Sequence, residues 1–382
     1  MNAPAAPLTY ESAGVDYGVI DPLKIHAQRA AAQTAVQLQV HGMHEVAASR
    51  GESAYVIDVG PFLLASIVEC LGSKALVADE MARLTGVSRY DAIAQDTIAM
   101  AINDLITVGA TPLVVQAYWA AGGSEWFKDA ARSQALVEGW QRACERCHVA
   151  WGGGETPALA GIVEPGRIDL AAGCTGIVNP KTRLSLGDSL QAGDAIVLLA
   201  SSGIHANGLS LARQLADTLP QGYLTALPSP STASSQPGAS SARTFGDALL
   251  EPTTLYSPVT EALHAAGVST HYAVNITGHG WRKLLRHPKP FTYRIHTVPP
   301  VPEVLRFIQD QATMSNKLAY ATFNMGAGFA LFLAADDAPR AVAIARALGI
   351  EAWDAGRVEA GAKQLLIKPL SLAYGADSLH VR

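Results

Sequence analysis

Short apolar runs recur along the whole chain and alternate with amphipathic segments, a pattern that predicts strands and helices in succession. Four runs in the first half have the length of strands, at 54–59, 63–68, 113–119 and 168–177. In the second half, the continuously apolar run 195–200 predicts a buried strand, and a helix is expected from Leu209 onward. An amphipathic helix is expected across 129–150.

The length of the chain predicts two domains. Its 382 residues exceed what one ordinary core supports. We expect a first domain at 1–180 and a second at 181–382, because 181–194 has the composition of a connector. Within the second domain, 228–243 is rich in Pro, Ser and Ala and cannot bury enough apolar surface to order itself. This segment is predicted to be an exposed, mobile insertion.

A glycine triplet at 152–154, followed by Glu155 and Thr156, is the first candidate for chemistry. Glycines give up side-chain burial and backbone entropy. Their bare amides can close around an oxyanion, and Glu155 could hold a cation or its water. A structural turn between strand and helix explains the triplet equally well when it is taken alone.

Three carboxylates and an amide lie in the otherwise apolar segment 90–104. If the segment is helical from Asp96 onward, then Asp96, Asn103 and Asp104 fall on roughly one face. Hard oxygen ligands on one face suit Mg²⁺, which shares its coordination shell with water and substrate phosphates. The alternative is that Asp91 caps the helix while Asp96 and Asp104 face solvent.

Two further segments combine glycines with hydrogen-bonding side chains. The loop after the predicted strand 195–200 contains Ser202, His205 and Asn207, at a position where α/β proteins often bind ligands. The apolar run 320–332 is interrupted by a glycine pair, which predicts a bulge or the close approach of another group. A strand, Gly-x-Gly turn and helix are also expected across 274–281.

Taken together and in this order, these motifs resemble those of the aminoimidazole ribonucleotide (AIR) synthetases, also called phosphoribosylformylglycinamidine cyclo-ligases. The resemblance covers nearly the whole chain. It is carried by Tyr-Glu-Ser-Ala-Gly-Val-Asp at 10–16, the acidic segment 96–105, Gly-Gly-Glu-Thr at 153–156, Ser-Gly-Ile-His-Ala-Asn-Gly at 202–208, 250–256, and Thr-Phe-Asn-Met-Gly at 322–326.

Two loops depart from the family pattern. Glu69 and Cys70 stand where the family usually has Asp and Gly in Thr-Asp-Gly-Val-Gly-Thr-Lys, so the reach and crowding of that loop must differ. His279 replaces the central glycine of the family's Gly-Gly-Gly turn. Its imidazole could add a donor to the turn or obstruct the pocket.

The resemblance implies a two-domain α/β (α+β) fold of the AIR synthetase kind, with mixed sheets flanked by helices. It implies a homodimer formed through the sheet of the first domain, which also binds ATP and metal, and an ATP site made by loops of both domains and of one or both subunits. The implied activity is an ATP-dependent cyclo-ligase of de novo purine biosynthesis, with ATP and Mg²⁺ as cofactors. It converts formylglycinamidine ribonucleotide to aminoimidazole ribonucleotide.

Site residues follow from matching the family's motifs. Metal ligands would be Asp96, Asp104 and Glu69. Residues that contact ATP or phosphate would be Lys74, Gly72, Asn103, Gly153, Gly154, Thr277, Gly278 and Gly280. Catalytic contacts would come from His205, Asn207 and Glu155. Two structural alternatives stay open, a solvated surface position for Lys74 and a helix first-turn carboxylate for Glu155.

Composition narrows the class of protein further. Hydrophobic residues make up 49% and charged residues only 16%, so a large area is expected to be buried inside domains or against a partner. The net charge of −5, without a long basic run, argues against nucleic acid as the main partner. No apolar run reaches membrane-spanning length, and residues 1–7 lack the pattern of an export signal. A cytoplasmic enzyme is expected.

Three alternatives remain at this point. The first is a related ATP-dependent enzyme that acts on another substrate, such as formylglycinamidine ribonucleotide synthetase or thiamine-phosphate kinase. The second is a nucleotide-binding dimer that has lost catalysis, which the changed loops at Glu69 and His279 would permit. The third is covalent haem attachment at Cys144-x-x-Cys147-His148, which is disfavoured because the motif lies in a predicted helix and no export signal is found.

Overall fold

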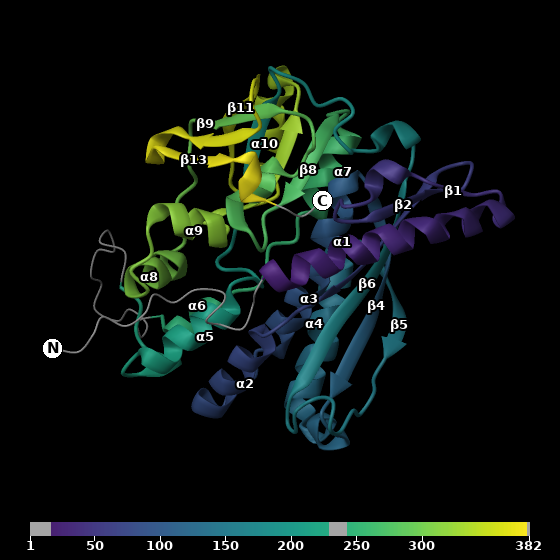
Figure 1. The fold of residues 1–382 in the computed structure, drawn as a ribbon. Helices are drawn as coiled ribbons and strands as arrows, with labels where there is room; N and C mark the ends of the chain where they lie inside the picture. The colour runs from purple at the N-terminus through teal and green to yellow at the C-terminus, as the bar shows by residue number, and fades with distance from the viewer. Residues whose placement is uncertain (1–16, 229–242, 380–382) are drawn as a thin grey trace.

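A computed structural model describes residues 17–228 and 243–379, in two layered halves (Figure 1). The expected insertion at 228–243 lies outside the described residues except for its two ends. The described residues on either side of the insertion lie together: the amide of Leu227 donates to the carbonyl of Arg243 at 2.9 Å.

The first sheet has six strands in the order β1-β2-β3-β6-β4-β5. Its neighbours pair antiparallel, except that β4 and β5 are parallel. The strands are β1 (His44–Glu45), β2 (Tyr55–Asp58), β3 (Leu63–Cys70), β4 (Thr111–Ala121), β5 (Ala150–Glu155) and β6 (Ile168–Val178). The accompanying helices are α1 (Tyr17–Thr34), α2 (Lys74–Thr85), α3 (Tyr90–Leu105) and α4 (Ala130–Arg146).

The second sheet has seven strands in the order β13-β12-β9-β11-β7-β10-β8, and only β12 and β9 pair in parallel. The strands are β7 (Ala195–Ala200), β8 (Thr270–Asn275), β9 (Phe291–Ile295), β10 (Ala327–Leu333), β11 (Ala352–Ala360), β12 (Gln364–Ile367) and β13 (Leu372–Gly375). The helices are α5 (Leu209–Thr218), α6 (Phe245–Leu249), α7 (Ser257–Ala265), α8 (Glu303–Gln311), α9 (Asn316–Thr322) and α10 (Ala338–Ala347). The expected fold class, mixed sheets flanked by helices, is confirmed.

Strands and helices predicted from hydrophobic periodicity are confirmed. The runs at 54–59, 63–68, 113–119, 168–177 and 195–200 form β2, β3, β4, β6 and β7, and the pattern in 129–150 forms α4. Two local predictions are wrong. The glycine triplet forms the edge strand β5 rather than a loop, and the motif at 322–326, which is a strand in the family pattern, is here the end of α9 followed by a turn.

Helix α3 lies at the centre of the molecule and positions the site. Thirteen of its 16 residues are buried, because it packs against the first sheet, against α4 and against the second half of the chain. The face that carries Asp96, Asn103 and Asp104 contacts the second domain. The prediction that these three polar side chains share one face is therefore confirmed, and the alternative that Asp96 and Asp104 face solvent is wrong.

Candidate functional site

A cavity of about 300 Å³ between the two domains collects several of the residues that the sequence singled out. From the first domain it receives Glu69 at the end of β3 and Asp104 at the end of α3. From the second domain it receives Asn207 and the turn that begins at Thr277 and Gly278. Side chains of the outer helix α1 complete the lining. Polar groups that converge on a cavity of this size are typical of a ligand site.

Two of the four carboxylates that line this cavity, Glu69 and Asp104, interact. Burial and the neighbouring carboxylate of Asp104 raise the pKa of Glu69 to about 7. Asp104 is buried, and one of its oxygens accepts a hydrogen bond from Asn275 Nδ2 at 2.7 Å. Paired carboxylates in a partly enclosed space are an environment that a cation would stabilise.

Two basic residues of the cavity were missed by the sequence analysis. Lys283 and Arg286 lie on and directly after the 3₁₀ helix at 280–285, which follows the Gly278–Gly280 turn. Side chains three residues apart superimpose on a 3₁₀ helix, so both point to the same side. A lysine and an arginine three residues apart, directly after a glycine turn, were the features of the sequence that could have indicated these two residues.

Lys74 and Asp96 lie away from the cavity in a fully buried ion pair. The Lys74 ammonium is 2.8 and 2.9 Å from the two carboxylate oxygens of Asp96 and also donates to the carbonyl of Glu251 at 2.8 Å. Thr253 donates to Asp96 through both its amide and its hydroxyl. Burial lowers the pKa of Lys74 and raises that of Asp96, and the attraction within the pair opposes both shifts. Lys74 and Asp96 thus bind each other and the loop at 251–253, whereas the family motifs led us to expect Lys74 at phosphate and Asp96 at the metal.

Asn103 joins the two domains. Its Nδ2 donates to the carbonyl of Thr254 at 2.8 Å, and its Oδ1 accepts from the amide of Tyr256 at 3.0 Å. Because the Asn103 side chain pairs with both a carbonyl and an amide of the loop at 254–256, it holds that loop in register against α3. Asn103 therefore contacts protein on its polar atoms, which differs from the expected contact with ATP.

His205 is buried and neutral. Its Nε2 accepts a hydrogen bond from the amide of Ser202 at 3.2 Å, and burial lowers the pKa of His205 to about 3. A β-carbon at Gly328 would come within 2.5 Å of the His205 ring and 2.0 Å of Tyr256 Oη, and one at Gly326 would lie 2.5 Å from the carbonyl oxygen of Pro300. The glycine pair at the start of β10 therefore does permit a close approach, as predicted. Asn207, two residues on, lines the cavity.

The turn at 277–280 is shaped by its glycines. Gly280 has a φ of 54°, and a β-carbon there would lie 2.4 Å from the carbonyl oxygen of Tyr320. Thr277 Oγ1 accepts from Lys283 Nζ, and Gly278 lines the cavity. Burial, with Lys283 and Arg282 nearby, lowers the pKa of His279 to about 4. Its imidazole is thus neutral near pH 7.

Besides the residues already described, four more predicted residues lie outside the cavity lining. Gly72 forms the turn into α2, with a φ of 77° and open space around it. Across the sheet, Glu155 on β5 lies opposite Tyr118 on β4, then Ala171 on β6 and then Cys70 at the end of β3. Three strand spacings, roughly 14 Å, therefore separate Glu155 from the end of β3. Pairing with β4 also explains why residue 154 is glycine, because a β-carbon there would lie 2.1 Å from a carbonyl oxygen of β4. Gly153 and Gly154 are exposed on this edge strand.

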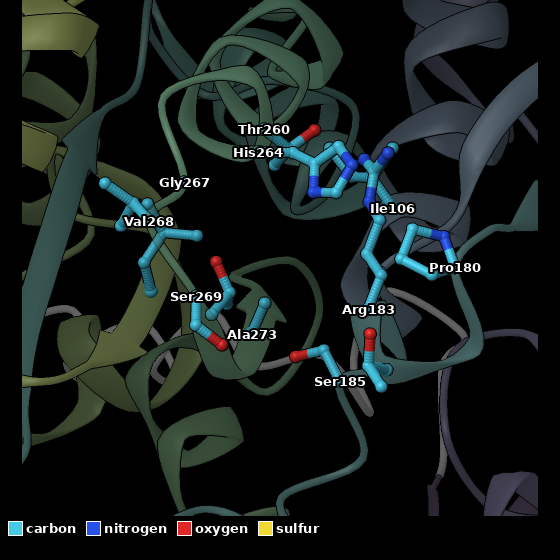
Figure 2. Close-up of a pocket in the computed structure, with 14 residues that line it drawn as sticks. Ile106, Pro180, Arg183, Ser185, Thr260, His264, Gly267, Val268, Ser269 and Ala273 are labelled. Carbon is cyan, nitrogen blue, oxygen red and sulfur yellow. The ribbon is translucent and has the colours of Figure 1, made fainter.

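Other features of the described residues do not enter this site. A cavity of about 200 Å³ beside residues 180–185 is lined by Arg183, Ser185 and His264, and by none of the predicted site residues (Figure 2). The thiols of Cys144 and Cys147 are buried, and burial raises their pKa values to about 12 and about 11. Residues 17–228 and 243–379 contain no group of three or more His, Cys, Asp or Glu side chains that could hold a metal unaided. Within the same ranges, no helix combines the length and apolarity needed to cross a bilayer.

Comparison with known proteins assigns the family. The chain matches the AIR synthase related protein N-terminal domain over 51–178 and the corresponding C-terminal domain over 191–368. A phosphoribosylformylglycinamidine cyclo-ligase of Methanothermobacter thermautotrophicus is 35% identical across 82% of this chain and 85% of that relative. The chain belongs to the AIR synthase family. A cyclo-ligase of Carboxydothermus hydrogenoformans is 31% identical across 94% of this chain and 98% of its own.

The fold of the AIR synthase family also appears in solved structures of more distant proteins. A thiamine-monophosphate kinase from Stenotrophomonas maltophilia has a TM-score of 0.55 at 18% identity, over 84% of this chain and 90% of that chain. At this identity the likeness shows the shared fold alone.

Proposed function

We propose that this chain is an ATP-dependent cyclo-ligase that converts formylglycinamidine ribonucleotide to aminoimidazole ribonucleotide in purine biosynthesis. The observation that carries the proposal is the interdomain cavity, where Glu69 and Asp104 share a polar space with Lys283 in an AIR synthase fold. A pocket with both carboxylates and cations suits a metal–phosphate ion pair. The curated relatives that match most of the chain bear this enzyme's name.

The donor set of the cavity fits Mg²⁺. Glu69 and Asp104 face the same space, and Mg²⁺ is commonly bound by one or two carboxylates together with substrate phosphates. We assign these two residues to the metal, with the amide of Asn207 beside them. When bound, Mg²⁺ would neutralise phosphate charge. Asp96, expected as a third ligand, instead fixes the loop at Thr253 against α3.

The proposed reaction moves one phosphoryl group and closes one ring. The formyl oxygen attacks the γ-phosphorus of ATP, the bond from that phosphorus to the bridging oxygen breaks, and ADP is released. An amidine nitrogen then attacks the activated carbon and loses its proton. The carbon–oxygen bond breaks, and phosphate leaves with the electron pair. Such chemistry depends mainly on positioning and charge neutralisation. Thr277, Gly278 and Gly280 are proposed to hold the ribose 5′-phosphate beside the cavity.

Buried residues of the site are proposed to act by holding loops in place. Lys74 and Asp96 tie α2 and α3 to the loop at 251–253. Asn103 holds the next residues of that loop, and His205 accepts the amide that begins its own loop. These contacts fix the domains on either side of the cavity.

We also propose a cytoplasmic homodimer that forms through the first sheet. Apolar side chains are exposed on two of its strands, with Val68 on β3 77% exposed and Leu113 on β4 43%. A second copy packed on this sheet would cover them. It would also bring Gly153, Gly154 and Glu155 against another subunit, which accounts for their distance from the cavity within one chain. Sedimentation velocity tests this proposal: Val68→Glu should yield monomer, and a monomeric parent protein would contradict it.

The test of the proposed function is ADP release with formylglycinamidine ribonucleotide and Mg·ATP. Release that depends on this substrate, with formation of the imidazole product, is expected. A panel that includes formylglycinamide ribonucleotide and thiamine monophosphate distinguishes a related ATP-dependent enzyme. ATP binding without turnover on any of them would favour a nucleotide-binding dimer that has lost catalysis.

A further inference from the structure

The cations that line the interdomain cavity differ in what already binds them. Arg286 is committed to the loop at 51–53: its Nε and Nη2 donate to the carbonyl of Gly51 at 3.1 and 2.8 Å, and its Nη1 donates to Ser53 Oγ at 2.8 Å. Lys24 of α1 lies 3.6 Å from Asp21, and its side chain is 57% exposed. Arg286 therefore holds the protein together, and Lys24 sits at the solvent side.

Lys283 is the cation whose surroundings point to a ligand. Its ammonium donates to Thr277 Oγ1, and in residues 17–228 and 243–379 no carboxylate oxygen lies within 4.0 Å of it. An ammonium has three donors, so one neutral hydroxyl leaves two N–H groups without a protein partner in these ranges. Glu69 and Asp104 act on the Lys283 ammonium through space rather than by contact. Room therefore remains between the ammonium and the carboxylates.

The charge balance of the cavity indicates what belongs in that room. The lining also carries Asp21 and Glu52, which lie 3.6 Å from Lys24 and 3.5 Å from Arg286. A divalent cation held by Glu69 and Asp104 would be matched by their two charges, so the charge of a transferred phosphoryl group would be met by another cation. Phosphoryl transfer gains most from preorganised positive charge on the equatorial oxygens. A lysine ammonium can bind phosphate as a compact point charge.

We propose that Lys283 is a catalytic residue whose ammonium binds the phosphoryl group that passes from ATP to the formyl oxygen. The inference rests on the proposed function. The ammonium contacts the phosphoryl oxygens while the bond from the γ-phosphorus to ADP breaks and the bond to the formyl oxygen forms. It contacts the same oxygens when the carbon–oxygen bond breaks and phosphate leaves with the electron pair. Thr277 positions the ammonium by accepting one of its hydrogens.

The test compares two nucleotides that differ by the γ-phosphoryl group. Isothermal calorimetry with Mg²⁺ measures the Kd of ADP and of the methylene-bridged ATP analogue AMPPCP, which the enzyme cannot hydrolyse. In Lys283→Met, which keeps the apolar stem and removes the charge, AMPPCP affinity should fall about 10- to 100-fold, the range for a hydrogen bond to a charged group. ADP affinity should stay within about twofold. Thr277→Val should give a smaller loss in the same direction.

Lys289→Met is the matched control. Lys289 is exposed six residues further on, donates only weakly to the carbonyl of Asp188 at 3.4 Å, and is outside the cavity lining. Its replacement should change neither Kd. Melting temperatures verify that each variant is folded, and Thr277→Val supplies the test if Lys283→Met does not fold.

The outcomes separate this inference from the proposed function. If the parent protein binds both nucleotides and Lys283→Met and Thr277→Val weaken them equally or not at all, the role of Lys283 is refuted while the cyclo-ligase proposal stands. If the parent protein binds neither ADP nor AMPPCP with Mg²⁺, both are refuted.

Discussion

Replacing Lys74 with methionine separates a structural lysine from one that binds phosphate. In the structure the substitution removes both ion-pair contacts to Asp96, at 2.8 and 2.9 Å, and leaves the carbonyl of Glu251 without its donor. Removing one member of a buried pair costs about 3–5 kcal/mol. Because burial already raises the pKa of Asp96, that carboxyl can take up a proton, which limits the loss to about 3 kcal/mol.

The assay is urea unfolding and thermal melting of the parent protein and Lys74→Met. For a domain of this size, about 3 kcal/mol corresponds to a fall of roughly 10 °C in melting temperature. Lys74→Met combined with Asp96→Asn should recover part of the loss, because the Asn oxygen can still accept from the amide of Thr253 at the position where Asp96 does. We expect a coupling of about 1–3 kcal/mol between the two positions. Exposed Lys289→Met should change stability by less than about 0.5 kcal/mol.

Parent-like unfolding of Lys74→Met, together with a loss of affinity for ADP and AMPPCP, would refute the structural role of Lys74. That result would indicate that Lys74 binds phosphate, as the family motif suggests.

Three further perturbations test other parts of the account. Asp104→Asn should leave the melting temperature nearly unchanged and abolish most Mg·ATP turnover, because a neutral amide cannot offset phosphate charge; near-normal turnover would remove Asp104 from the metal site. Burial lowers the pKa of His205 from 6.5 to about 3, so below pH 6.5 the imidazole binds a proton in the unfolded chain but not in the folded protein. His205 should then contribute about 2 kcal/mol to the fall in unfolding free energy from pH 7 to pH 5, and His205→Asn should reduce that fall by the same amount; an unchanged slope would show that the ring is accessible to water. Gly328→Ala should cost about 1–3 kcal/mol in urea unfolding, because its β-carbon would collide with buried groups. Gly123→Ala, with open space around it, is the control, and equal effects would contradict the packing described.

Local periodicity explains which parts of the fold could be predicted from the sequence. The apolar run 195–200 needed only its composition to be recognised as a strand, and β7 occupies the same residues. The shared face of Asp96, Asn103 and Asp104 also follows from helical geometry.

Contacts between distant segments explain what could not be predicted. Asp96 and Asn103 look alike as ligands in sequence, but their partners, Thr253 and Thr254, lie about 150 residues away and are provided by the fold. The glycine triplet forms a strand because β4 offers a parallel partner, which no local pattern encodes. Lys283 was missed because a lysine next to a glycine turn is unremarkable until the cavity places it near Glu69 and Asp104.

The proposed activity transfers phosphate to the formyl oxygen of formylglycinamidine ribonucleotide and then closes the ring. It is tested most directly by supplying the substrate with a heavy oxygen isotope in the formyl group and analysing the released phosphate by mass spectrometry. We expect one labelled oxygen in each phosphate, together with one imidazole product for each ADP. Unlabelled phosphate, or ADP release without ring closure, would contradict it.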